Sequence, residues 1–350
     1  MSDSITENQI LEALDRVNDP EIGRSLTSLG MIKNIRIYDG SVSLSLVLTT
    51  PACPMKSQMK KAVEDAIMAI PGVSETDVRL DSQIPQRAPM KQKRQIPGVK
   101  NVIVVASGKG GVGKSTVAVN LAAALARSGA KTALLDADIY GPSIPIMMGI
   151  HEIPHSDGEM IIPFERFGIK TMSIGFIVPQ DKAVIWRGPM IMKALEQLLY
   201  EVRWGDTDYL IIDMPPGTGD TQLTIAQIVP VTGAVIVTTP QDVALVDAVK
   251  GINMFNEVEI PIIGIIENMS FFLCPHCEER TDIFAHGGGK KAADDLCVPF
   301  LGEIPIDISI RKAGDAGIPI VEADPDSPQA QAFIRIAENI AARISVIDLS

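Results

Sequence analysis

The chain has 350 residues, 46% of them hydrophobic and 21% charged, a balance typical of soluble globular proteins that are long enough for more than one domain. Its formal net charge of −12 argues against a nucleic-acid-binding surface, because neutralising phosphates requires clustered Lys and Arg. The sequence shows no N-terminal leader and no apolar run near the ~20 residues that span a bilayer, so we predict a cytoplasmic protein with no nucleic-acid or membrane partner.

Residues 1–80 are predicted to form a small α+β domain with the element order αββαβ. The dipeptide Asp39-Gly40 separates two segments of alternating polarity, which favours a two-residue β-hairpin. The expected elements are a helix that begins at the capping box Thr6–Gln9, strands over residues 31–38 and 41–48, a helix over residues 55–69 and a strand near residues 78–80.

Cys53 lies in the loop TTPACP, residues 49–54, just before the second predicted helix. A position near a helix N-terminus would lower the pKa of its thiol. The loop resembles the Thr-x-Pro-x-Cys-Pro loop of a small domain in cytosolic iron–sulfur assembly factors. Because no His or Cys is close in sequence, the alternative is a semi-buried cysteine that acts only as a small apolar residue.

Residues 81–99 contain prolines, glutamines and a basic run but no apolar periodicity, so they are predicted to be a linker. In residues 100–350, continuous apolar segments alternate with helical ones, which predicts a doubly wound and mostly parallel α/β sheet. Ligands of such sheets bind at the C-terminal ends of strands. The expected buried strands cover residues 102–106, 131–135, 209–212, 234–237 and 261–266.

A glycine-rich loop, GKGGVGKST, follows the first of these strands and precedes a helical segment. This order predicts a P-loop, in which backbone N–H groups and a helix N-terminus surround the phosphates of a nucleotide. Lys114 would neutralise phosphate charge, and the Ser115 hydroxyl would bind Mg²⁺. The predicted nucleotide-binding residues of the loop are Gly108, Lys109, Gly110, Gly111, Val112, Gly113, Lys114, Ser115 and Thr116.

The loop carries an additional lysine, Lys109, directly after its first glycine. With this spacing the loop resembles the deviant Walker A motif of the MinD/ParA-type ATPases. The resemblance implies that Lys109 reaches across a two-fold axis to the nucleotide of a partner subunit and acts with Lys114 in catalysis. The alternative is a solvated lysine on a loop.

Carboxylates follow two of the predicted strands. Asp136 and Asp138 come after the strand that follows the P-loop helix, and Asp213 ends the strand before the loop MPPGTGD. We expect Asp138 to position the attacking water, Asp213 to be the Walker B carboxylate, and Asp136 to lie nearer the outer shell of the Mg²⁺. The alternative for such residues is a helix cap.

Asn268 and the turn at residues 302–307 match the places where MinD/ParA-type ATPases bind adenine. The sequence has no Asn-Lys-x-Asp guanine signature, so this resemblance favours ATP over GTP. The alternative is an ordinary Asx turn.

A C-x-x-C loop, Cys274 to Cys277, follows Asn268 and presents two thiols with the spacing of half a metal or cluster site. One alternative is a zinc knuckle that recruits His276 or His286, and another is half of a Cys₄ site completed by a second subunit. A thioredoxin-like redox pair would need a thioredoxin fold, and two incidental thiols remain the simplest alternative. Cys297 has no partner spacing and is assigned no role.

In combination, these motifs resemble the Mrp/ApbC-type iron–sulfur cluster carrier ATPases, and the resemblance covers nearly the whole chain. It implies a homodimer with a [4Fe–4S] cluster bridged by Cys274 and Cys277 of each subunit. The cluster would be delivered to apoproteins, with ATP binding or hydrolysis controlling the transfer. The rivals are a spatial-organiser ATPase of the MinD/ParA type and a zinc-stabilised P-loop ATPase. The acidic charge and the C-x-x-C loop favour the carrier.

Overall fold

The computed structural model describes residues 5–84, 94–177 and 188–349. The chain divides into two compact units, one of residues 1–85 with 341–350 and one of residues 86–340. The predicted linker covers residues 81–99, of which residues 85–93 lie outside the described ranges. Strand β3 ends at Ser82 and β4 begins at Val99. None of the described helices is both long enough and apolar enough to cross a membrane.

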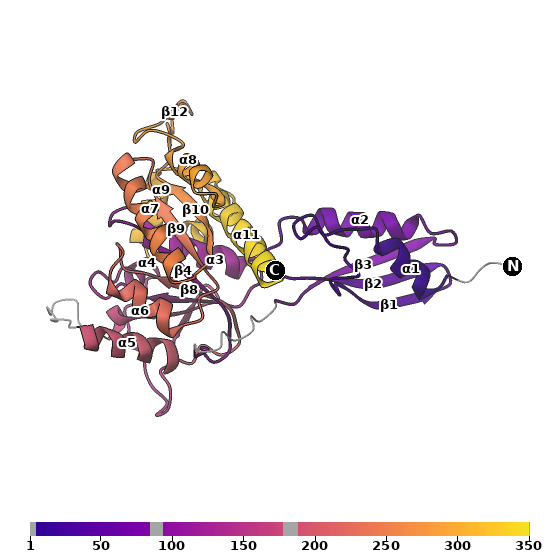
Figure 1. Cartoon of the computed structure of the whole chain (residues 1–350), viewed down its shortest axis with the longest axis horizontal. Helices are drawn as coiled ribbons and strands as arrows, with labels where there is room; N and C mark the ends of the chain where they lie inside the picture. Colours follow the sequence, from indigo (N-terminus) through magenta and orange to yellow (C-terminus); the bar gives the residue numbers. More distant parts are fainter. Residues whose placement is uncertain (1–4, 85–93, 178–187, 350) are drawn as a thin grey trace. The chain divides into compact units, whose positions relative to one another are not determined.

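The first unit has the predicted order αββαβ (Figure 1). Strand β2 pairs antiparallel with β1 and parallel with β3, and the side chains of β2 alternate between buried and half-buried. Helix α2 packs on β2 and β3, and α1 packs on α2, so the buried side of β2 meets the helices. The elements are α1 (Glu7–Leu14), β1 (Ile32–Tyr38), β2 (Ser41–Leu48), α2 (Lys56–Met68) and β3 (Glu75–Ser82).

The capping box predicted for the first helix is present. The Thr6 hydroxyl accepts a hydrogen bond from the Gln9 backbone N–H, and the Gln9 side chain accepts one from the Thr6 N–H. The third strand is longer than predicted, because it runs beside β2 for eight residues. Its sequence, ETDVRLDS, buries only Val78, so it has little apolar periodicity to reveal its length.

The second unit is built on an eight-stranded sheet with the order β13-β10-β9-β4-β8-β5-β7-β6. All neighbouring strands are parallel except β6 and β7, which confirms the predicted doubly wound, mostly parallel sheet. Its strands are β4 (Val99–Ala106), β5 (Thr132–Asp136), β6 (Phe164–Arg166), β7 (Ile169–Ser173), β8 (Thr207–Asp213), β9 (Gly233–Thr238), β10 (Ile262–Asn268) and β13 (Phe300–Ile304).

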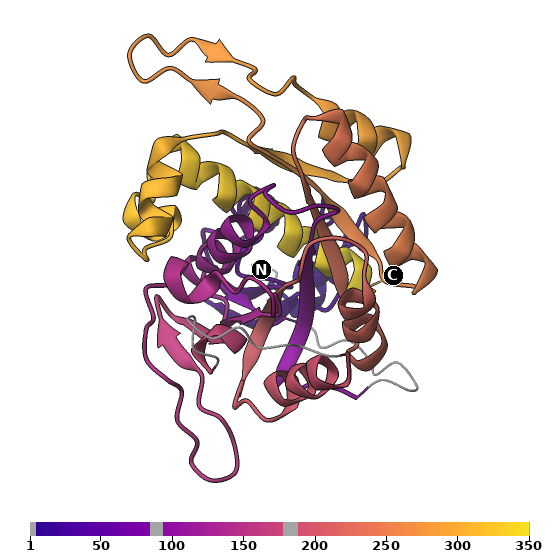
Figure 2. The same cartoon turned by 90° about the vertical axis from the view of Figure 1, so that its left-hand side faces the viewer.

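Helices cover both faces of this sheet (Figure 2). The connection from β4 to β5 runs toward one edge of the sheet, whereas that from β9 to β10 runs toward the other. Right-handed crossovers therefore place α3 and α7 on opposite faces. The helices are α3 (Lys114–Arg127), α4 (Ile144–Met147), α5 (Gly188–Tyr200), α6 (Asp220–Ile228), α7 (Asp242–Glu257), α8 (Gly288–Asp295), α9 (Ile308–Asp315), α10 (Ile320–Ala323) and α11 (Pro328–Leu349). Of α11, only the part before residue 341 belongs to this unit.

This reversal of direction lies beside β4, the strand that leads into the glycine-rich loop. A crevice opens at the carboxyl ends of the strands where a parallel sheet reverses in this way, and ligands bind there. The strands on either side are fully buried, as their continuous apolar sequences predict. The fold thus brings the ends of β4, β5, β8 and β10 to one edge of the sheet.

Candidate functional site

The glycine-rich loop joins β4 directly to α3, as predicted. Gly111 and Gly113 both have φ of +80°, a conformation that favours glycine. A Cβ at Gly113 would lie 2.3 Å from Nδ2 of Asn268, so this position also has no room for a side chain. The Asn268 amide donates a hydrogen bond of 2.8 Å to the Val112 carbonyl. Asn268 therefore ties the end of β10 to the loop.

Lys114 meets the carboxylate at the end of β8. Its side chain is only 6% exposed, and its Nζ lies 2.5 Å from Oδ1 of Asp213 and 4.0 Å from Oδ2 of Asp138. Nζ also donates to the Ser115 hydroxyl at 3.3 Å. The fold thus gathers Lys114, Ser115, Asp138 and Asp213, four of the residues assigned from sequence to a nucleotide phosphate site.

Asp213 is fully buried, and burial raises the pKa of its carboxyl while the nearby Lys114 ammonium opposes the rise. Oδ1 of Asp213 pairs with Lys114, whereas Oδ2 has no hydrogen-bond partner. A buried oxygen without a partner carries a free-energy cost. Asp213 and Ser115, which both contact the Lys114 ammonium, offer oxygen ligands of the kind that Mg²⁺ prefers.

Asp136 differs from Asp213 because both of its carboxylate oxygens accept hydrogen bonds. Its carboxyl accepts from the backbone N–H of Asp138 and Ile144 and from the Ser173 hydroxyl at 2.9 Å. Burial, and then the charge of Asp213, raise the pKa of Asp136 to about 8. These bonds hold the loop that carries Asp138, so Asp136 shapes this part of the site.

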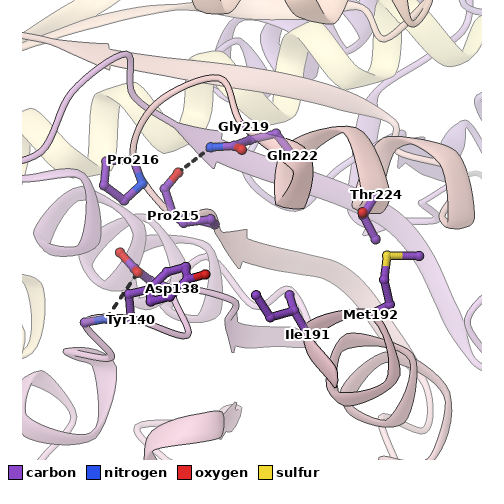
Figure 3. Close-up of a pocket in the computed structure, with 10 residues that line it drawn as sticks. Asp138, Tyr140, Ile191, Met192, Pro215, Pro216, Gly219, Gln222 and Thr224 are labelled. Carbon is purple, nitrogen blue, oxygen red and sulfur yellow. Dashed lines mark hydrogen bonds between the residues drawn. The ribbon is translucent and has the colours of Figure 1, made fainter. Parts of the chain in front are cut away.

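Asp138 opens onto a cavity of about 790 Å³. The cavity also touches the switch loop, residues 214–219 between β8 and α6, and the start of α5 (Figure 3). The Gln222 side chain donates to the carbonyls of Pro215 and Gly217 at 2.7 and 2.9 Å, which fixes the switch loop. Gln222 belongs to no sequence motif, so only its contacts in the folded chain reveal this role.

A second cavity, of about 680 Å³, lies on the other side of Gly113 and Asn268. Its wall is mostly apolar, and the turn after β13 contributes Pro305, Ile306 and Asp307. The two segments predicted to bind adenine therefore line one pocket. This pocket begins at the glycine-rich loop, as a pocket for the base of a loop-bound nucleotide must.

The two cysteines of the C-x-x-C loop lie at the tip of a hairpin that extends from the second unit (Figure 2). We call residues 271–283 the cysteine hairpin, formed by β11 (Phe272–Leu273) and β12 (Arg280–Thr281). Cys277 is exposed and Cys274 half-buried. The backbone N–H groups of His276 and Cys277 bond to the Cys274 sulfur and lower its pKa, which favours the thiolate that binds metals.

Across the described ranges, no three side chains of His, Cys, Asp or Glu gather closely enough to hold a metal ion. The described part of one chain therefore offers no third protein ligand beside the two thiols. His286 contacts the Glu303 carboxylate at 3.5 Å rather than joining the cysteines.

Residues 98–341 match the ParA family of proteins described as NUBPL iron-transfer P-loop NTPases. The chain belongs to this family. Residues 7–80 match a second family, described as iron-sulfur cluster assembly proteins. The fold and the recognised family are those that the sequence motifs predict, and they support an ATPase that carries clusters over a spatial-organiser ATPase.

Relatives of this NTPase family match along most of the chain. The iron-sulfur cluster carrier protein of Synechocystis is 48% identical over 99% of both chains. That of Escherichia coli K12 is 46% identical over 93% of this chain and 89% of its own. A nucleotide-binding protein of Archaeoglobus fulgidus in complex with ADP is 40% identical, has a TM-score of 0.59, and covers 68% of this chain and 93% of its own.

One interpretation from the sequence of this NTPase is wrong. Cys53 was expected to have a lowered thiol pKa, but its side chain is only 6% exposed, and burial raises the pKa to about 11. Burial outweighs the backbone hydrogen bond from Met55, at the start of α2, which by itself would lower the thiol pKa. The alternative, a buried small apolar residue, describes Cys53 better. Cys297 is exposed at the surface.

Proposed function

We propose that this chain is an ATP-dependent carrier that receives a [4Fe–4S] cluster as cargo and transfers it to apoproteins. The observation that supports it best is the pair of thiols at an exposed hairpin tip, on a P-loop NTPase of the iron-transfer family. A [4Fe–4S] cluster ordinarily needs four thiolates. Two copies of the hairpin, related by a two-fold axis, supply them in the simplest arrangement. Cys274 and Cys277 are the proposed cluster ligands.

In this proposal the nucleotide is ATP with Mg²⁺. The backbone of residues 108–116 surrounds the phosphates, and Lys114 exchanges its contact with Asp213 for the β- and γ-phosphates. Ser115 and the free oxygen of Asp213 would hold the Mg²⁺, which would neutralise charge on the phosphates. Asp138, within 4.0 Å of the Lys114 ammonium, orients the attacking water.

The homodimer is also part of the proposal. Lys109 lies on the loop beside the phosphates and is half-buried, and the ammonium would reach the nucleotide held by the partner. We further propose that the chain has three parts: residues 1–80 form an assembly-type domain, residues 81–99 a linker, and residues 100–350 the carrier ATPase. The chain would act in the cytoplasm, without nucleic acid or membrane.

The decisive experiment is anaerobic reconstitution of the full chain with iron and sulfide. We expect about four irons per dimer and the charge-transfer absorption of a cluster. Cys274→Ser and Cys277→Ser should lose both and still bind ATP, because the P-loop is a separate part of the fold. Cys297→Ser is the matched control, since it removes another exposed thiol, and Cys53→Ser tests the buried one.

Two results would contradict the carrier function. A Cys274/Cys277 double variant that still holds about four irons per dimer would place the ligands elsewhere. A wild-type chain that binds zinc tightly and never holds iron would make the hairpin a structural zinc knuckle. Transfer is then tested by mixing the loaded carrier with an apoprotein and following the gain of that protein's activity.

A further inference from the structure

The apolar pocket beside the glycine-rich loop is lined partly by the cysteine hairpin. Phe272 of β11 and Ile283, just after β12, both line it. Gly113 and Asn268 line the same pocket from the P-loop side. Phe272 of β11 is two residues before Cys274, so a ligand in this pocket touches the hairpin that carries the thiols.

A chain of polar contacts joins β10, at the residue next to Asn268, to the other strand of the hairpin. Next to Asn268 along β10, the buried Glu267 accepts a hydrogen bond of 2.5 Å from the Ser270 hydroxyl. Ser270 also bonds to Oε2 of Glu303 at 3.1 Å, and Arg280 of β12 donates to that same oxygen at 3.4 Å. The Arg280 guanidinium covers the Phe271 ring at 4.1 Å.

Glu267 also fixes the segment that follows the hairpin. Its carboxylate accepts from the backbone N–H of Gly289 at 2.5 Å and of Gly287 at 3.3 Å, at the start of α8. A Cβ at Gly289 would lie 3.0 Å from that carboxylate, so the helix start packs closely on it. The segments that precede and follow the hairpin are thus both bonded to Glu267, the neighbour of Asn268 on β10.

The cavity beside Asp138 has no such connection. Its lining comes from the loop after β5, from α5, from the switch loop and from α6, and includes no residue of the cysteine hairpin. The side of the site where γ-phosphate chemistry is proposed is therefore separate from the hairpin, whereas the base pocket includes it.

We propose that the base of the bound nucleotide, rather than its γ-phosphate, sets the position of the cysteine hairpin through Phe272 and Ile283. This inference rests on the proposed function and deepens it. Ile283 is 51% exposed without a ligand, so a purine ring that covers it removes apolar surface from water. Such a contact orders the two strands of the hairpin where they leave the rest of the unit. If the nucleotide changes the affinity of the hairpin tip for the cluster by some factor, then by linkage the cluster changes the affinity for the nucleotide by the same factor.

The first test is amide hydrogen exchange on the metal-free chain, with ADP and with inorganic tripolyphosphate as probes. Tripolyphosphate is added until residues 108–116 are protected as strongly as by ADP, which shows that the phosphate loop is occupied. We expect ADP to slow exchange in residues 271–283 and tripolyphosphate to leave that exchange unchanged. The hairpin amides to follow include Cys274 and Glu278, which bond across the turn.

The second test is the affinity for ADP, measured by titration calorimetry. Ile283→Ala should weaken ADP binding by about threefold to tenfold, because part of an apolar wall is lost. It should also reduce the protection of residues 271–283 at saturating ADP. Ile153→Ala is the matched control, since Ile153 is 79% exposed and lies outside the pocket. It should leave both measurements at the wild-type values.

The proposal requires both results. Protection of the hairpin by tripolyphosphate would overturn it, because the signal would then pass through the phosphate loop. Unchanged ADP affinity in Ile283→Ala, or equal losses in Ile153→Ala, would overturn it as well. These measurements use no iron, so they are independent of cluster reconstitution. If reconstitution fails while these results hold, the carrier function is wrong and the link between base and hairpin stands.

Discussion

Replacing Gly113 with alanine should destabilise the second unit and weaken nucleotide binding together. Two effects combine at this position. The φ of +80° is unfavourable for an L-residue and costs about 1–2 kcal/mol. The new Cβ would also lie 2.3 Å from the Asn268 amide, so that amide must leave the Val112 carbonyl. Losing this hydrogen bond adds about 0.5–1.5 kcal/mol.

Gly111→Ala separates the two effects. Gly111 has the same φ of +80°, but a Cβ there meets no atom within 4 Å. It should therefore cost only the backbone strain, about 1–2 kcal/mol, whereas Gly113→Ala should cost about 1.5–3.5 kcal/mol. The difference between the two variants measures how tightly Asn268 is packed against the loop.

Urea unfolding followed by tryptophan fluorescence gives these free energies. The chain has two tryptophans, and Trp204, which is buried in the second unit, reports on the unfolding of that unit. ADP titration of the folded variants should show the larger loss of affinity for Gly113→Ala, because Asn268 also lines the base pocket. Equal unfolding free energies for the two variants would refute the packing argument.

Three further predictions concern ionisable groups. Lys114→Ala should abolish ATP binding, whereas Asp138→Ala should keep binding and lose turnover, as nucleotide titration and phosphate release would show. Burial, and then Asp213, raise the pKa of Asp136 from 3.8 to about 8, so the folded chain keeps a proton that the unfolded chain releases. The free energy of unfolding should therefore fall as pH rises from about 4 to about 8, by at most about 1.4 kcal/mol per pH unit, and Asp136→Asn should flatten this slope in urea titrations. Cys53, with its pKa raised to about 11 by burial, should be alkylated by iodoacetamide at pH 8 far more slowly than the exposed Cys277, and equal labelling in peptide mass spectra would contradict this.

The sequence by itself determined the fold class and the elements that carry the chemistry. Continuous apolar segments such as VIVVA and YLII indicate buried parallel strands, because only a strand covered on both faces can be apolar throughout. The glycine-rich loop could be recognised because it needs glycines at fixed places for the backbone to surround an anion. These features depend only on residues that are close together in the sequence, so the sequence is enough to recognise them.

Only the tertiary structure decided which of the predicted residues meet. Asp136, Asp138 and Asp213 look alike in sequence, yet Asp136 satisfies three hydrogen bonds within the protein and Asp213 keeps a free oxygen. The environment of Cys53 was misjudged for a related reason: proximity to a helix start is visible in sequence, whereas burial depends on how α2 packs against the sheet.

Phe272 and Ile283 show the same limit. Nothing in their local sequence links them to the glycine-rich loop, which lies more than 150 residues earlier in the chain. They line its pocket because β10 ends next to the loop and the hairpin begins there. Strand order is set by many weak contacts distributed over the whole sheet. No single motif encodes it, so these neighbours appear only in the folded chain.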